Sequence, residues 1–379
     1  MRLFSFGTPG VRTTADDVDV LRLIRSRRVG PATFHRLTAE HGSVAAALAA
    51  LPQIAAAAGV RDYAPCPPGV AQAELRAGQR MGARLLRYDA PDYPPLLRTI
   101  PDAPPVLWCL GDPAMLTRPA VAVIGARNAS SLGLRMAQGM AHGLSQAGLV
   151  VTAGLARGID TAAHKAALEG GTVAVLATGL DSIYPAENTT LAARIAETGC
   201  LLTEQPFGTK PAARHFPARN RIVSGLCAAT VVVEAAQRSG SLITARLALD
   251  QGREVMAVPG HPMDARASGC NALIRDGAAL VRHSGDVLAA LAELGIEPAA
   301  AAGTLPDPTP EPVLSPAPQA PPADLRDHIL SQLSPSPTDE DWLIRHLAAP
   351  PAAATAMLTA LELEGRITRM SGGKLALTG

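Results

Sequence analysis

The sequence predicts an α/β fold in which a doubly wound, mostly parallel sheet lies between an N-terminal helical domain and a C-terminal winged-helix-like domain. Three observations predict it. Short apolar runs alternate with helical segments after Ala120, and this alternation requires crossover connections between parallel strands. Hydrophobic residues make up 47% of the chain but aromatic residues only 3%, which favours a core of small aliphatic side chains between helices and a parallel sheet. A Pro- and Ala-rich segment then separates a last, short domain.

The composition also excludes several classes of protein. With 379 residues, of which 18% are charged, the chain is long enough for two or three domains and too apolar to be disordered. No signal-peptide pattern and no membrane-length apolar run is found, so we expect a cytoplasmic protein. The cysteines form no CxxC pair and show no metal-ligand spacing, which predicts buried thiols, no disulfide and no metal. They are Cys66, Cys109, Cys200, Cys227 and Cys270. We also expect no cofactor.

Residues 1–85 are predicted to form the helical domain. Apolar residues recur at helical spacing from Asp16 to Leu51, namely Leu21, Ile24, Val29, Phe34, Leu37, Val44, Leu48 and Leu51. The turn at residues 29–33 contains Gly-Pro and is similar to turns of sterile-alpha-motif and helix-hairpin-helix modules, which contact DNA phosphates through backbone amides. A purely structural helical cap is the alternative interpretation. Prolines at positions 65, 67 and 68 end these helices, and an extended segment around residues 93–105 leads into the next domain.

Residues 86–297 are predicted to form the sheet domain. Its strands are short apolar runs, which we place at residues 121–125, 149–152, 173–176, 201–203, 230–233 and 255–258, with a helix at 132–147 after the first. Sheets of this kind bind ligands beyond the carboxyl ends of their strands. We therefore expect the functional residues in the loops that follow the strands.

Residues 298–322 are predicted to be a semi-rigid linker and residues 323–379 the winged-helix-like domain. In the latter, a third helix near 353–364 is followed by two short strands around Gly372-Gly373. Its third helix is rich in Ala and carries Glu362 and Glu364, so it is poorly suited to reading DNA. Protein contact and weak DNA contact both remain open for this domain.

The segment between Glu204 and Glu234 contains no acidic residue, although the chain as a whole has a formal net charge of only +1. It carries Lys210, Arg214, Arg219 and Arg221, with Phe216 among them. Arginines beside an aromatic ring suit a polyanion with flat faces, such as single-stranded nucleic acid. The alternative is a basic surface loop that is paired with acidic residues from elsewhere in the fold.

Two further loops are predicted to hold phosphate. After the first strand, Arg127 replaces the second glycine of a dinucleotide-binding loop, and Ser130 or Ser131 can cap a helix whose free N–H groups favour an anion. An ordinary capped turn is the alternative. After the fifth strand, Ser239-Gly240-Ser241 opens another helix and offers amides and hydroxyls. Asp160 and His164 are one helical turn apart, and we prefer a helix-stabilising role for them over a catalytic pair.

These blocks resemble the DNA-processing protein A family (DprA, also called Smf). The resemblance rests on Val121–Arg127, Gly154–Leu168, Val173–Pro185, Phe216–Leu226 and Val232–Thr244, and most specifically on the combination of FPxRNRI with SGSLxT. It implies an extended Rossmann-like domain that binds single-stranded DNA as a homodimer. It further implies that the protein displaces single-strand-binding protein and loads the RecA recombinase on incoming strands during natural transformation.

When the family's motifs are matched to this sequence, the resemblance implies a set of DNA-binding residues and no catalytic residue. Arg127 and Ser130 match the first phosphate loop, and Phe216 matches the ring against which a base packs, with a buried structural ring as the alternative. The remaining matches are Arg219, Asn220 and Arg221 in the signature, then Ser239, Gly240, Ser241 and Thr244. Ala213 stands where some relatives have a lysine, and Lys210 or Arg214 is expected to replace that charge.

Two enzymatic alternatives are weaker. Phosphoribohydrolases of the lysine-decarboxylase-like type share this sheet, but their loop ends in a glutamate that is missing after Thr244, whereas Glu234 precedes the corresponding loop here. A dinucleotide-dependent oxidoreductase conflicts with the bulk of Arg127. The chain also lacks a Walker lysine loop, a nucleophile elbow and an HExxH motif, so we expect a protein that binds rather than an enzyme.

Overall fold

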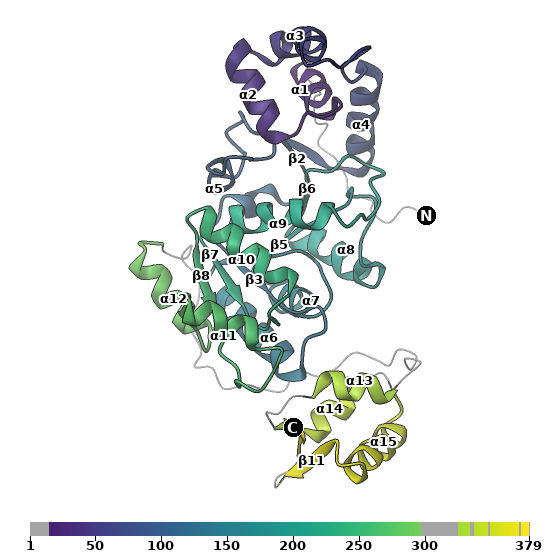
Figure 1. Ribbon diagram of the computed structural model, residues 1–379, viewed down its shortest axis with the longest axis vertical. Helices are drawn as coiled ribbons and strands as arrows, with labels where there is room; N and C mark the ends of the chain where they lie inside the picture. Colours follow the sequence, from purple (N-terminus) through teal and green to yellow (C-terminus); the bar gives the residue numbers. More distant parts are fainter. Residues whose placement is uncertain (1–14, 297–324, 334–336, 348, 371–372, 379) are drawn as a thin grey trace.

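The computed structural model describes residues 15–296, 325–333, 337–347, 349–370 and 373–378. The predicted linker at 298–322 lies outside the described residues, so its boundaries stay a prediction. Figure 1 shows the helical N-terminal part at the top, the α/β part in the middle and the C-terminal part below.

Four helices form the N-terminal part: α1 (Ala15–Arg25), α2 (Pro31–His41), α3 (Val44–Ala57) and α4 (Pro68–Met81). All eight apolar positions predicted for this region contribute to one core, five of them buried and three partly buried, which confirms the helical periodicity. The same core includes Trp108 and Leu201 from the adjacent edge of the sheet, so the helices are packed firmly against it. The indole N–H of Trp108 donates to Glu74 of α4 at 2.8 Å.

The central part contains a nine-stranded sheet with the order β1-β2-β6-β5-β4-β3-β7-β8-β9 within the described residues. The strands are β1 (Arg84–Arg87), β2 (Val106–Gly111), β3 (Ala120–Ile124), β4 (Val150–Ala153), β5 (Thr172–Val175), β6 (Cys200–Thr203), β7 (Ala229–Val232), β8 (Glu254–Ala257) and β9 (Ala279–Leu280). Strands β3 to β9 pair in parallel, whereas β1–β2 and β2–β6 are antiparallel. The prediction of a mostly parallel sheet is therefore confirmed. The antiparallel strands β1 and β2 flank the segment at residues 93–105, which was predicted to be extended and instead contains a short helix at Pro95–Arg98.

Helices cover both faces of this sheet, as a doubly wound fold requires. One face packs against α5 (Pro95–Arg98), α9 (His215–Leu226), α10 (Gly240–Asp250) and α11 (Ser268–Arg275). The other packs against α6 (Ser131–Gln146), α7 (Ile159–Ala166) and α12 (Ser284–Glu293), while α8 (Thr189–Thr198) joins the core shared with the N-terminal helices. The strand order reverses between β3 and β7, so the loops after these two strands meet at the topological switch point.

The prediction missed helix α9, because it treated the basic segment as a connection without a helix. Pro217 and Gly225 disturb the helical pattern in this segment. In the structure, however, Pro217 occupies the first turn of α9, where its missing N–H costs no intrahelical hydrogen bond. The basic segment therefore includes a rigid helix that begins at the carboxyl edge of the sheet.

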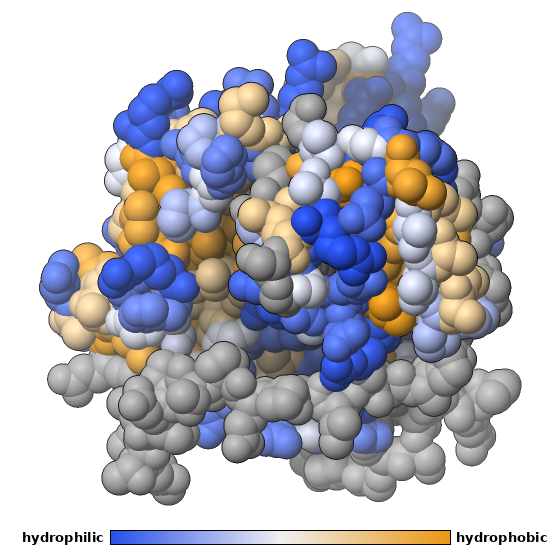
Figure 2. All heavy atoms as spheres, turned by 90° about the horizontal axis from the view of Figure 1, so that it is seen from below, coloured by the Kyte–Doolittle hydropathy of each residue, from blue (hydrophilic) through white to orange (hydrophobic). Residues whose placement is uncertain are grey.

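The C-terminal part has the winged-helix arrangement that the sequence predicts. It contains α13 (Leu325–Gln332), β10 (Thr338–Asp339), α14 (Glu340–His346), α15 (Pro351–Leu363), β11 (Ile367–Met370) and β12 (Lys374–Leu377), with strand order β10-β12-β11. Figure 2 views the molecule from this end and shows hydrophilic and apolar side chains interspersed on the surface. Within the described residues, no helix combines the length and the apolar character needed to cross a membrane.

Candidate nucleic-acid interface

The loops after β3 and β7 touch each other at the switch point. The amide of Ala126 donates to the carbonyl of Glu234 at 2.7 Å. Gly125 lies so close to the Glu234 backbone that an added Cβ would stand 2.9 Å from the same carbonyl and 2.6 Å from Ile159. This crowding requires glycine at the strand end and turns Arg127, two residues on, outward to solvent.

The N-terminus of α6 binds an internal carboxylate. Glu234 accepts hydrogen bonds from the backbone N–H of Ser130 at 3.0 Å and from its hydroxyl at 2.5 Å, and the hydroxyl in turn caps the amide of Gly133. Ser130 is only 3% exposed, and burial raises the pKa of Glu234 while the bonds from Ser130 oppose that shift. The donors that the sequence analysis reserved for a DNA phosphate are thus used inside the protein. Ser130 is placed for a structural role and not for direct contact.

Arg219 is also internal. Its side chain is buried, and its guanidinium donates to the carbonyls of Gly154 and Val175 at the carboxyl ends of β4 and β5. A Cβ at Gly154 would stand 2.3 Å from the guanidinium, so glycine leaves the space that this group fills. Burial lowers the pKa of Arg219 to about 10, which still leaves it charged at neutral pH, with the buried Asp160 nearby to favour that charge.

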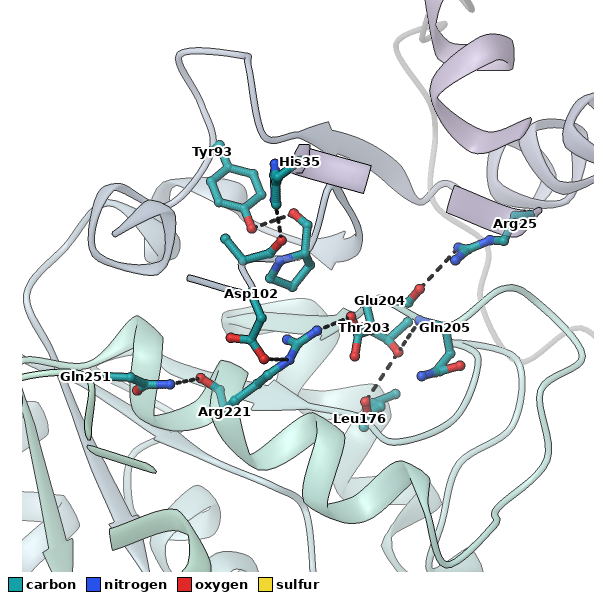
Figure 3. Close-up of polar contacts among 12 residues, drawn as sticks. Arg25, His35, Tyr93, Asp102, Leu176, Thr203, Glu204, Gln205, Arg221 and Gln251 are labelled. Atoms are coloured by element: carbon teal, nitrogen blue, oxygen red, sulfur yellow. Dashed lines mark hydrogen bonds and ion pairs between the residues drawn. The ribbon is translucent and has the colours of Figure 1, made fainter. Parts of the chain in front are cut away.

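Arg221 joins three parts of the chain. Figure 3 shows it pointing at Asp102 and Glu204, with N–O distances of 3.0 and 2.6 Å. It is 7% exposed, and the backbone carbonyl of Glu204 also accepts a hydrogen bond from Arg25 of α1 at 3.1 Å. Arg219 and Arg221 therefore anchor α9 to the sheet instead of pointing at solvent. Asn220, between them, is half-buried and accepts from Arg219 at 3.3 Å.

Three side chains from three loops come together on the surface of the carboxyl edge. The guanidinium of Arg127 lies over the ring of Phe216, 5.3 Å from its centroid, and the ring of Tyr184 lies 5.6 Å from that of Phe216. Arg127 follows β3, Tyr184 follows β5 and Phe216 begins α9. Phe216 is half-buried, whereas Arg127 and Tyr184 are exposed. Arg127 and Phe216 are among the predicted site residues, whereas Tyr184 is not.

The cations around this cluster differ in how they are neutralised. Lys210 and Arg214 are exposed and precede Phe216 in the chain, and neither they nor Arg127 form an ion pair with any carboxylate of the described residues. Arg221, by contrast, is paired with acidic residues. Pairing with acidic residues of the fold, the alternative interpretation, therefore holds for Arg221 but not for the outer cations.

The loop after β7 offers a second polar surface at the same edge. Ser239 caps α10 by accepting from the amide of Ser241 at 3.4 Å, and the two hydroxyls are 2.7 Å apart. Ser239 and Ser241 are half-buried and Gly240 is exposed, so this loop is open to a ligand. Thr244 is 4% exposed and lies inside, where it cannot contact DNA directly.

Asp160 and His164 each have partners of their own. Asp160 accepts from the amides of Gly154 and Ala156 at 2.9 and 3.3 Å, which fixes the loop before α7. The Nδ1 atom of His164 lies 2.7 Å from the hydroxyl of Thr172, and burial lowers the pKa of His164 to about 3. These contacts give both residues a structural role, but in fixing the preceding loop and the contact with β5, since no side chain caps α7.

Comparison with known proteins agrees with this geometry. The model of the family described as DNA recombination-mediator protein A matches residues 84–292, and models of a DprA-like N-terminal HHH domain and a DprA winged helix domain match residues 14–77 and 313–373. The chain is 47% identical over 199 residues to DNA processing protein DprA of Streptococcus pneumoniae, covering 52% of this chain and 70% of that protein. It is 38% identical over 298 residues to protein Smf of Escherichia coli, covering 77% of each.

Two solved structures share the fold. The crystal structure of DprA from S. pneumoniae superposes with a TM-score of 0.63 at 36% identity, covering 74% of this chain and 98% of that chain. The structure of DNA processing protein A from Helicobacter pylori, described for its single-stranded DNA binding mode, superposes with a TM-score of 0.52 at 29% identity, covering 56% and 96%.

Proposed function

Because this chain belongs to the DNA recombination-mediator protein A family, also known as DprA or Smf, we propose that it binds single-stranded DNA at the carboxyl edge of its sheet. The observation that carries the proposal is the contact of the exposed Arg127 with the half-buried ring of Phe216, which the exposed and unpaired cations Lys210 and Arg214 precede in the chain. An aromatic ring with adjacent unneutralised cations suits a strand whose bases are unpaired and whose phosphates are accessible.

The proposed contacts are fewer than the sequence motif suggests. Arg127, Lys210 and Arg214 contact phosphates, the Ser239–Ser241 loop adds amide and hydroxyl donors, and Phe216 packs against a base. Arg219, Asn220, Arg221, Ser130 and Thr244 position these groups. Since phosphate contacts carry most of the binding, we expect affinity that depends little on sequence and strongly on salt.

We also propose a broader role, which membership of the family supports. The protein acts in the cytoplasm as a homodimeric mediator that protects incoming single strands, displaces single-strand-binding protein and loads RecA during natural transformation, without catalysing a reaction of its own. Glu234 precedes the loop that corresponds to the phosphate loop of phosphoribohydrolases. Its carboxylate is buried and accepts hydrogen bonds from Ser130, which favours a binding site over an enzymatic one.

Binding to a labelled 20-nucleotide oligo-dT and to a duplex of equal length tests the proposal. We expect tighter binding of the single strand, and weaker binding after Lys210→Ala/Arg214→Ala than after the control Arg36→Ala. Arg36 is an exposed arginine of α2 that pairs with Glu40. Equal affinity of the double variant and the control would contradict the proposed surface, and failure of the wild type to bind any DNA at low salt would contradict the function. The mediator role predicts faster RecA filament growth on strands already covered by single-strand-binding protein.

A further inference from the structure

Tyr184 presents an aromatic ring to solvent beside the proposed DNA site. It is 46% exposed, and within the described part of the chain its hydroxyl has no hydrogen-bond partner. The other tyrosines of the sheet domain are used differently: Tyr93 is buried with its hydroxyl on the carbonyl of Pro104, and Tyr88 packs between Tyr93 and His35. Tyr184 is therefore not explained by the core.

The loop that carries Tyr184 is held at both ends. The amide of Gly179 donates to the carbonyl of Thr209 at 3.2 Å, and the carboxylate of Asp181 accepts from the amide of Gly208 at 2.9 and 2.8 Å. Four residues after the ring, the side chain of the buried Asn188 donates to the carbonyl of Leu155 at 2.9 Å. Because these bonds already order the loop, a ligand that stacks on the ring loses little conformational entropy in fixing it.

The surroundings of Phe216 leave Tyr184 as the more accessible ring. The guanidinium of Arg127 lies over the Phe216 ring, while Tyr184 approaches the same ring at an interplanar angle of 56°. Arg127 and Tyr184 thus both lie against the ring of Phe216, and Tyr184 is the more exposed of the two rings. A strand whose phosphates reach Arg127 would thus pass its bases along Phe216 and Tyr184.

We propose that Tyr184 is a second base-stacking ring, so that the interface receives two unpaired bases of a single strand instead of one. This inference rests on the proposed function and adds to it the class of ligand group that Tyr184 takes, an unpaired nucleobase. The bases of a duplex are covered by their neighbours, so this ring favours single strands over duplexes without reading sequence.

The test compares a dT oligomer with an abasic oligomer of the same length and backbone, using the full-length wild type, Tyr184→Ala and Tyr184→Phe. We expect Tyr184→Ala to bind the dT oligomer about 5- to 150-fold more weakly, since stacking contributes roughly 1–3 kcal/mol per base. Binding of the abasic oligomer should stay at the wild-type level, and Tyr184→Phe should restore binding of dT. Tyr63→Ala serves as the matched control, because Tyr63 is a half-buried tyrosine between α3 and α4, in the N-terminal part of the protein.

The outcomes separate this inference from the proposed function. Wild-type affinity of Tyr184→Ala for dT, or an equal loss on both oligomers, would overturn the stacking role while leaving DNA binding intact. Failure of the wild type to bind the dT oligomer would overturn both. Photo-crosslinking to a 5-iodouracil oligomer gives an independent readout, because a stacked Tyr184 should appear in the crosslinked peptide and its absence from every crosslinked peptide would contradict the proposal.

Discussion

The arginines of the FPxRNRI motif support the fold at this edge of the sheet, and the exposed arginine comes from another loop. Arg219 and Arg221 are buried and bonded to other segments, whereas Arg127, from the neighbouring loop, faces solvent. Sequence alone could not separate them, because the carbonyls of Gly154 and Val175 and the carboxylates of Asp102 and Glu204 come from distant parts of the chain. A motif therefore marks the site without telling which of its residues touch the ligand.

Stability measurements distinguish the two kinds of arginine. Arg219→Ala should lower the free energy of unfolding by about 3–5 kcal/mol, because it leaves two buried carbonyls and the buried Asp160 without their cation. Arg127→Ala should change it by no more than about 0.5 kcal/mol. Urea denaturation of both variants checks this, and similar costs for the two would refute the assignment.

His164 should make stability depend on pH. Burial lowers its pKa from 6.5 to about 3, so the unfolded chain binds a proton below pH 6.5 while the folded protein does not. Stability is then fully present above pH 6.5 and falls as the pH drops toward 3, by at most about 1.4 kcal/mol per pH unit from this group. The melting temperatures of wild type and His164→Leu between pH 7 and 5 measure the effect. The variant should show the flatter profile, and parallel profiles would contradict the account.

At the scale of elements, the N-terminus of α6 is a helix start whose anion is supplied by the protein itself. The Glu234 carboxylate occupies the amide and hydroxyl of Ser130, and a Cβ at Gly133 would stand 2.4 Å from it. This arrangement fixes the loops after β3 and β7 to each other, while Arg127 of the loop after β3 stays exposed to solvent.

Replacing the cap should affect folding more than binding. Ser130→Ala removes the helix cap and one of two donors to a buried carboxylate, so we expect a loss of about 1–3 kcal/mol in the free energy of unfolding. The salt dependence of DNA binding by the folded variant should match that of wild type. A flatter dependence would show that Ser130 contacts a phosphate after all.

Most elements could be predicted because their patterns are local. The apolar runs of β3 to β8 and the 3.6-residue period of the N-terminal helices follow from adjacent residues. Helix α9 was missed because Pro217 and Gly225 break its periodicity, and the antiparallel strands β1 and β2 because proline-rich sequence surrounds them. Tyr184 could have been selected from sequence as one of few aromatics after a strand, but its approach to Phe216 depends on the order of β3, β4 and β5 in the sheet.

At the scale of the whole molecule, the winged-helix domain rests against the sheet domain near the start of α6. Arg266 donates to the carbonyl of Leu333, just after α13, at 2.7 Å. Arg135 of α6 lies 5.3 Å from the ring centroid of Trp342. The hydroxyl of Ser131, next to the cap of α6, is 3.5 Å from that of Thr338. The domain thus contacts the same helix whose N-terminal loop carries Arg127.

Removing the two cationic contacts should release this domain. Arg135→Ala/Arg266→Ala should increase the radius of gyration measured by small-angle X-ray scattering, since it removes the contact with the ring of Trp342 and the hydrogen bonds to the carbonyls of Leu330 and Leu333. Arg275→Ala, an exposed arginine of α11 paired with Asp276, is the control. Scattering curves of the double variant and wild type that superimpose would show that other contacts hold the domains together.

The salt dependence of single-strand binding tests the central claim most directly. That claim is that Arg127, Lys210 and Arg214 neutralise phosphates at the carboxyl edge of the sheet. For single strands the slope of log K against log salt is about −0.7 per phosphate neutralised, so the triple alanine variant should flatten the slope by about 2 relative to wild type. Arg36→Ala should leave the slope unchanged. A triple variant that binds oligo-dT with the wild-type slope would contradict the account and place the DNA elsewhere on the protein.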